Sequence, residues 1–114
     1  MKKVFTGNTS SVGKFNNEWI IGDKMKKYPE LFSKSTFIKW SKHKKGEERK
    51  EFIENKNLST LVVLIKGKVQ HLFKDKATLL EKEGDFVFYE KGVSHRWKML
   101  KDSFIVTIQF LNKK

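Results

Sequence analysis

The residues best suited to chemistry in this chain are its three histidines, because imidazole titrates near neutral pH and exchanges protons readily. His95 is followed two positions later by Trp97, and this spacing places both side chains on one face of a β-strand. The pair predicts a ligand site in which His95 acts as a general acid or base and Trp97 stacks against a ring-shaped ligand. Packing of both side chains in a core is the alternative, and the spacing is compatible with either.

The other two histidines have plainer interpretations. His71 shares its strand face with Val69 and Phe73, so it is expected to pack in the core, with ligand binding as the alternative. His43 stands at a predicted strand end among three lysines, whose charges favour its neutral form. We therefore expect His43 to be a surface residue.

Two further side chains are candidates for ligand binding. Arg49 ends the run Glu47-Glu48-Arg49, which would suit a hydroxyl-rich or carboxylate ligand if it projected over a pocket mouth. A solvated charged loop is the alternative. Tyr89 follows Phe88 on a predicted strand, so the two rings face opposite sides of the sheet and one of them is available for a dimer contact.

These residues lie on short segments whose apolar positions recur at every second residue, which is typical of β-strands separated by turns. The run from Leu58 to Ile65 is almost continuously apolar and predicts a strand buried on both faces. About eight short strands at regular spacing predict an all-β sandwich or barrel. The predicted strands of the barrel are Thr36 to His43, Leu58 to Ile65, Lys68 to Phe73, Ala77 to Leu80, Phe86 to Tyr89, His95 to Met99 and Phe104 to Phe110.

A length of 114 residues predicts one domain over 1–114, with an irregular N-terminal arm over 1–35 and the barrel over 36–112. Within the arm, Trp19-Ile20-Ile21 is expected to form a short strand, and the segment from Met25 to Phe32 one or two helical turns. The arm is rich in apolar residues for a free terminus. We therefore expect a homodimer in which the arm covers its own sheet or crosses to the partner.

Composition narrows the classes of partner. The net charge of +12 raises nucleic acid as a partner, but only two of the 25 basic residues are arginines, so 25 − 2 = 23 are lysines scattered along the chain. Nucleic-acid recognition favours arginine forks and a clustered stripe, so this class is the least expected. The chain has no cysteine and no apolar segment of about 20 residues, so we expect a cytoplasmic protein with no membrane partner.

The segment from Gly84 to His95 resembles the second cupin motif, with a glycine, five residues, a turn ending in Gly92, two residues and a histidine. It departs from the motif at Glu90, where the family usually has proline, and at Met99, where it often has asparagine. Gly46 and Gly67 resemble the glycines that begin and end the first motif. The resemblance implies a cupin-type double-stranded β-helix, that is, a jelly-roll barrel.

A group of short stand-alone bacterial cupins of unassigned activity is more specifically similar. The similarity rests on residues that occur in the same order along the chain, namely Trp19, Trp40, the stretch from His43 to Arg49 and the stretch from Gly92 to Trp97. Some members of this group carry the name signal peptidase. That activity is not expected here, because no segment is apolar enough to hold a peptidase at the membrane.

Metal-binding cupins use two histidines, a glutamate and a later histidine, and here only the later one, His95, is retained. Phe52 and Glu54 stand at the first two positions and Thr60 at the third. The resemblance therefore implies no bound cofactor. A divalent metal held by His95 with Glu54, His43 or His71 is the alternative, and would imply isomerase or dioxygenase chemistry.

The sequence thus predicts a cupin-fold protein that binds a small polar or cyclic ligand without the usual metal. Whether it catalyses a reaction is left open, with His95 as the candidate catalytic residue. A metal-dependent cupin enzyme is the alternative, and a lysine-rich nucleic-acid-binding protein is less expected. The predicted ligand-binding residues are His95, Trp97, His71, Thr60, Tyr89, Arg49 and Glu54.

Overall fold

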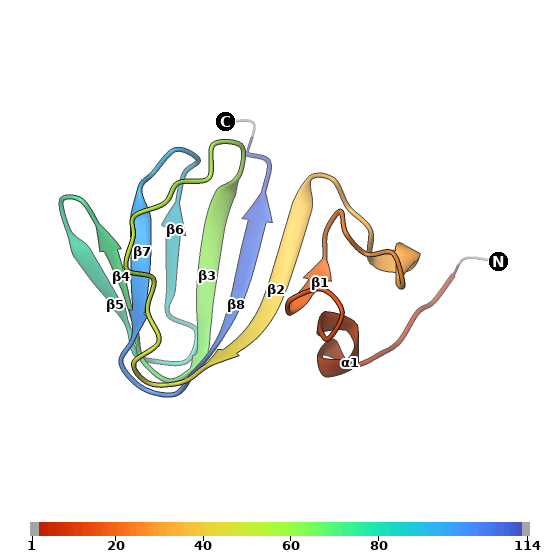
Figure 1. Cartoon of the computed structure of the whole chain (residues 1–114), viewed down its shortest axis with the longest axis horizontal. Helices are drawn as coiled ribbons and strands as arrows, with labels where there is room; N and C mark the ends of the chain where they lie inside the picture. Colours follow the sequence, from red (N-terminus) through yellow and green to blue (C-terminus); the bar gives the residue numbers. More distant parts are fainter. Residues whose placement is uncertain (1–2, 113–114) are drawn as a thin grey trace.

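The computed structural model describes residues 3–112 and consists mainly of two antiparallel sheets that face each other (Figure 1). The larger sheet has the strand order β1-β2-β8-β3-β6, and the smaller has the order β5-β4-β7. The strands are β1 (Trp19–Ile21), β2 (Thr36–His43), β3 (Ser59–Lys66), β4 (Val69–Phe73), β5 (Ala77–Leu80), β6 (Phe86–Tyr89), β7 (His95–Met99) and β8 (Ser103–Phe110). The prediction of an all-β fold is confirmed, with strand bounds within about one residue of those expected.

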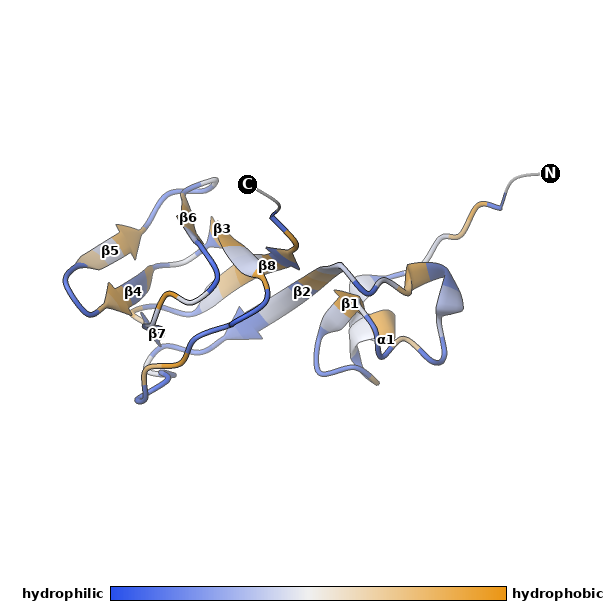
Figure 2. Cartoon of the chain, turned by 90° about the horizontal axis from the view of Figure 1, so that it is seen from above, coloured by the Kyte–Doolittle hydropathy of each residue, from blue (hydrophilic) through white to orange (hydrophobic). Residues whose placement is uncertain are grey.

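Alternation along each strand separates the inner face of the barrel from its outer face. Thr60, Val62 and Leu64 of β3 are buried between the sheets, whereas the intervening Leu61 and Val63 are only partly covered. The prediction that this strand is buried on both faces is therefore wrong, because no second layer from residues 3–112 lies over the outer face. Strands such as β5 and β6 are largely hydrophobic, and most loops are hydrophilic (Figure 2). The core comprises Val62, Leu64, Val69, Leu80, Val87, Met99 and Ile105.

The loop between β2 and β3 closes one side of the barrel by running along β7 (Figure 1). The amide of Arg49 donates to the carbonyl of Trp97 at 2.9 Å, and Ile53 and His95 exchange two backbone hydrogen bonds of 3.0 and 2.9 Å. Backbone pairing thus fixes this charged loop against a strand. The loop is therefore held in place over the space between the sheets.

The N-terminal region lies beside β2, at one end of the molecule (Figure 1). It contains the short helix α1 (Thr9–Gly13), the strand β1 and the 3₁₀ helix η1 (Pro29–Leu31). The strand predicted at Trp19–Ile21 is confirmed and pairs with β2, while α1 was not predicted. Val12 and Met25 are the buried apolar side chains of this region. No helix within residues 3–112 is long and apolar enough to cross a membrane.

Candidate functional site

A cavity of about 150 Å³ lies between the two sheets and receives side chains from both of them and from the loop along β7. Five of the predicted ligand-binding residues line it together. They are Arg49, His71, Tyr89, His95 and Trp97. Strands distant in sequence meet inside a barrel, which explains why residues spread over half of the chain converge here.

His95 is buried at the start of β7, with its ring directed into the cavity. Its Nδ1 lies 3.0 Å from the carbonyl oxygen of Val93, to which it donates a hydrogen bond. Burial lowers the pKa of His95, the Val93 carbonyl opposes this shift, and the positive charge of Arg49 adds to it. The neutral ring therefore offers Nε2 as an acceptor, and the protonated ring offers it as a donor.

Tyr89 lies between two histidines, with its ring 6.3 Å from that of His71 on one side and in contact with His95 on the other. A hydrogen bond joins its hydroxyl to Thr60, its cross-strand neighbour on β3. Burial raises the pKa of Tyr89 to about 12, although Thr60 and the charge of Arg49 oppose the shift. Tyr89 is thus a neutral hydrogen-bonding group near pH 7 and not a base.

His71 is only 2% exposed, and its Nδ1 has no hydrogen-bond partner among the described residues. Burial lowers the pKa of His71 to about 4, and the nearby His95 adds to the effect. The predicted packing among apolar neighbours is therefore observed, since Val69 shares its strand face. An unpaired buried nitrogen is costly, however, and His71 also lines the cavity.

His43 does not lie on the surface as predicted, because its side chain is only 13% exposed and lines the cavity. Its Nε2 lies 3.0 Å from the Ser41 hydroxyl, and its Nδ1 lies 3.1 Å from a carboxylate oxygen of Glu47. Its ring also lies 5.2 Å from that of Trp97. The neighbouring lysines led to the wrong prediction, since alternation along β2 turns Lys42 outward and His43 inward.

The mouth of the cavity is formed by exposed or partly exposed residues of the loop and of the larger sheet. Arg49 and Ile53 come from the loop, while Trp19 and Lys39 come from β1 and β2. The Lys39 ammonium lies 5.6 Å from the Trp19 ring centroid, within cation–π distance. Arg49 therefore projects over the pocket mouth, which is one of the two positions considered for it from sequence.

The remaining two candidates lie apart from the cavity lining. Thr60 is fully buried and reaches the site only through its hydrogen bond with Tyr89. Glu54 is exposed in the loop and does not line the cavity. Sequence reasoning missed other polar lining residues, although their period of two along β2 and β8 was a usable signal. These residues are Lys39, Ser41, Thr107 and Gln109.

The residues present do not fit the metal site of the fold family. Phe52 and Glu54 are exposed, Thr60 offers a hydroxyl already bound to Tyr89, and only His95 keeps its family position. Within residues 3–112 no three histidine, cysteine or acidic side chains are grouped closely enough to hold a metal ion. The alternative set built on Glu54 fails in addition because that carboxylate lies outside the cavity.

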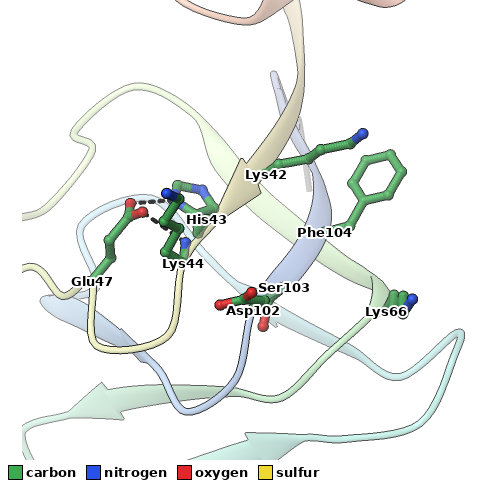
Figure 3. A pocket seen from close by; sticks show the side chains of 8 residues that line it. All are labelled: Lys42, His43, Lys44, Glu47, Lys66, Asp102, Ser103 and Phe104. Atoms are coloured by element: carbon green, nitrogen blue, oxygen red, sulfur yellow. Dashed lines mark hydrogen bonds and ion pairs between the residues drawn. The ribbon is translucent and has the colours of Figure 1, made fainter.

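A wider, open hollow of about 530 Å³ lies outside the barrel, between the ends of β2 and β8 (Figure 3). Its two carboxylates already bind the backbone, since Glu47 accepts from the Lys44 amide at 2.7 Å and Asp102 accepts from the Lys45 amide at 2.8 Å. Three lysines share the hollow with Phe104, and Figure 3 shows Lys42 and Phe104 pointing away from His43. The cavity between the sheets is the better candidate because its polar groups converge.

Two packed antiparallel sheets with this strand order and an internal cavity define a double-stranded β-helix, or jelly roll. More particularly, the chain has the cupin fold, as comparison with solved structures shows. A cupin superfamily protein from Desulfitobacterium hafniense matches with a TM-score of 0.63 and 18% identity over 70% of this chain and 71% of that one. A cupin protein from Bacteroides fragilis matches with a TM-score of 0.65 and 13% identity over 76% and 75% of the two chains.

KdgF from Halomonas sp. is similar at a TM-score of 0.63 and 12% identity, over 71% of this chain and 74% of its own. No protein-family model matches the sequence. No curated protein matches it either. Identities this low establish the fold, which confirms the expectation from the glycine and histidine spacing, and function has to be argued from the site.

Proposed function

We propose that this protein binds a small polar or cyclic ligand in its barrel cavity, without the metal that many cupins carry. His95 and Trp97 lie at the centre of the site, and His71, Tyr89 and Arg49 complete it. The observation that carries the proposal is the convergence of polar side chains on one cavity between the sheets, among them the buried His71 with its unpaired Nδ1.

The cavity volume limits the size of the ligand. A cavity of about 150 Å³ is below the usual range for drug-sized molecules, roughly 300 to 1,000 Å³, and matches an engineered protein cavity known to hold benzene. The rings of Trp97 and Tyr89 give it aromatic walls. A single six-membered ring with one or two polar substituents therefore suits the site.

The proposal is tested by NMR titration with single-ring fragments, namely phenol, cyclohexanol, benzamide and benzoate. We expect at least one of them to shift the ring signals of His95 and Trp97. Thr107→Leu should abolish the shifts by filling the cavity, whereas the control Val106→Leu, on the opposite face of β8, should not. If none of the four fragments shifts these signals, the proposal is wrong.

Elemental analysis separates this proposal from the metal-dependent alternative. Protein purified without added metal is expected to contain no stoichiometric transition metal. A metal present at one equivalent and lost in His95→Ala would instead establish an unusual metal site. No specific contact in residues 3–112 favours that alternative at present.

A further inference from the structure

We infer that the ligand of the barrel cavity is a small organic carboxylate, an inference that rests on the proposed function and deepens it. The charged side chains that line the cavity within the described part of the chain are Lys39 and Arg49, and both are cationic. No aspartate or glutamate from residues 3–112 lines it. The cavity mouth therefore carries uncompensated positive charge.

Neither cation is neutralised elsewhere in the described structure. The ion pairs found within residues 3–112 involve neither Lys39 nor Arg49. The carboxylate of Glu47, which contacts the lining residue His43, is occupied by that contact and by the Lys44 amide. Concave sites lined by charge of one sign concentrate their field on an ion of the opposite sign.

Arg49 is suited to a carboxylate in particular. Its guanidinium is planar and matches the two oxygens of a carboxylate in a bidentate pair, which is stronger than a neutral hydrogen bond. Its backbone is fixed by the 2.9 Å hydrogen bond to Trp97, and its charge acts on two residues of the lining, Tyr89 and His95. A carboxylate at the mouth would place the body of the ligand between the rings of Trp97 and Tyr89.

The test compares benzoate with benzamide, which have almost the same shape and differ in charge. Isothermal titration at low salt is expected to give benzoate the lower Kd by about tenfold or more, because hydrogen bonds to charged groups exceed neutral ones by roughly that factor. Arg49→Gln should remove most of this preference. Lys98→Gln, which removes an exposed lysine of the same β7 region outside the cavity, is the matched control and should keep it.

The outcomes distinguish the inference from the proposed function. If benzamide binds as tightly as benzoate, the carboxylate inference is wrong while the ligand-binding pocket stands. If neither compound binds up to millimolar concentration and the other fragments also fail, both are wrong. Equal loss of benzoate binding in Arg49→Gln and Lys98→Gln would show only a general charge effect and would also overturn the inference.

A second, independent inference concerns the outer face of the larger sheet, which we propose to be the contact surface for a second copy of the chain. Outward side chains of β8, β3 and β6 are apolar and partly or fully exposed, with Phe86 63% and Phe88 41% exposed. Cross-strand pairing places Leu61 beside Phe88 and Ile108, which shows that these side chains share one face. The N-terminal region lies beside β2, at the end of the sheet away from β3 and β6 (Figure 1).

The lack of charge on this face favours a second copy over another partner. A third of all residues in the chain are charged, yet the charges on this face lie at its end, at Lys42 and Lys66 beside Phe104. An acidic partner would be attracted to the lysine-rich surfaces instead, whereas a flat apolar face is complementary to itself about a two-fold axis. Ring pairs such as Phe88 with Phe110, at 6.3 Å, supply rigid anchors.

The size of the face suits a dimer. At about 3.4 Å per residue and about 4.8 Å between strands, three strands of up to eight residues present a plane of roughly 27 by 14 Å, about 400 Å². Projecting aromatic rings raise the accessible area above this value, toward the ~800 Å² per partner of a typical stable interface. Two such sheets would pack about 10 Å apart.

Sedimentation velocity at tens of micromolar tests this inference. The wild-type protein is expected to sediment as a dimer and Phe88→Lys as a monomer. Leu79→Lys is the matched control, because Leu79 is 43% exposed but lies on the outer face of the smaller sheet. A monomeric wild type, or equal effects of the two variants with unchanged circular dichroism, would overturn the inference.

Discussion

The ring of Tyr89 lies against that of His95, with centroids 4.3 Å apart and planes inclined by 37°. Tyr89 is tied to β3 through its hydrogen bond with Thr60, while His95 is tied to the turn before β7 through the Val93 carbonyl. The two rings therefore join the larger sheet to the smaller one across the cavity. Each holds the other in a position from which it can contact a ligand.

Tyr89→Phe is expected to lower the free energy of unfolding by about 1 to 2 kcal/mol, because the buried hydroxyl of Thr60 loses its partner. The ring contact with His95 is kept in this variant. Urea denaturation measures the change. Tyr28→Phe, a half-buried tyrosine of the N-terminal region, is the control and should change stability by less than about 0.5 kcal/mol; equal effects would contradict the role assigned to the Thr60 hydrogen bond.

His71 makes stability depend on pH. Its pKa is about 4 in the folded protein, below its usual value of 6.5, so the unfolded chain binds the proton more readily. Stability is therefore complete above about pH 6.5 and falls as the pH is lowered toward 4, by about 3 kcal/mol in total. Thermal or urea denaturation across this range measures the effect.

His71→Leu should flatten that dependence and change stability at neutral pH by less than about 1.5 kcal/mol, because an unpaired nitrogen is replaced by a side chain of suitable shape. The difference between wild type and variant isolates His71 from the carboxylates that titrate in the same range. A variant that loses stability on acidification as steeply as wild type would contradict the low pKa of His71.

Much of the fold could be predicted from the sequence because period-two alternation and turn glycines act locally. The segment from Phe86 to Tyr89 illustrates this, since its spacing from Gly84 and Gly92 indicates the strand and alternation places Phe88 and Tyr89 on opposite faces. The prediction for the outer face of β3 was wrong because coverage of a face depends on residues distant in sequence. An apolar run reveals that a face is hydrophobic, and it does not reveal whether another layer covers that face.

The site was less predictable because its members are brought together by tertiary pairing. His43 was assigned to the surface from its neighbours in sequence, whereas its register against Ser103 turns it inward. Arg49 lies in a charged loop whose position depends on backbone bonds to β7, and nothing in the loop sequence encodes that pairing. His95 could be predicted because its spacing from Gly84 and Gly92 resembles the second cupin motif, whose histidine points into the barrel.

Benzoate binding should strengthen as the pH is lowered from about 8 toward 6.5, the usual histidine pKa, and below it. Burial and the Arg49 charge hold the pKa of free His95 below its usual value, and a bound carboxylate favours the protonated ring, so binding takes up protons. Other titratable or charged groups that face His95 in this site are Lys39 and His43 of β2, Arg49 of the loop, His71 of β4 and Tyr89 of β6.

The pH dependence of the Kd should be absent for benzamide, and for benzoate it should be reduced in His95→Gln. Isothermal titration at several pH values measures it. His71 stays neutral across this window because its pKa is about 4, so it does not contribute to the slope. Tighter benzoate binding at higher pH, or an unchanged slope in His95→Gln, would contradict the part assigned to His95.

Gly67 and Gly46 both have positive φ, +110° and +93°, but only Gly67 is closely surrounded. A Cβ at Gly67 would lie 2.6 Å from both the Asp102 carbonyl oxygen and the Cα of Ser103, and would also overlap the Ser103 hydroxyl. A Cβ at Gly46 would have no neighbour within 4 Å. Gly67→Ala should therefore lower the free energy of unfolding by about 3 kcal/mol or more, and Gly46→Ala by about 1 kcal/mol from backbone strain alone. Urea denaturation of the two variants measures the difference, and equal losses would show that the turn between β3 and β4 can move away from Ser103.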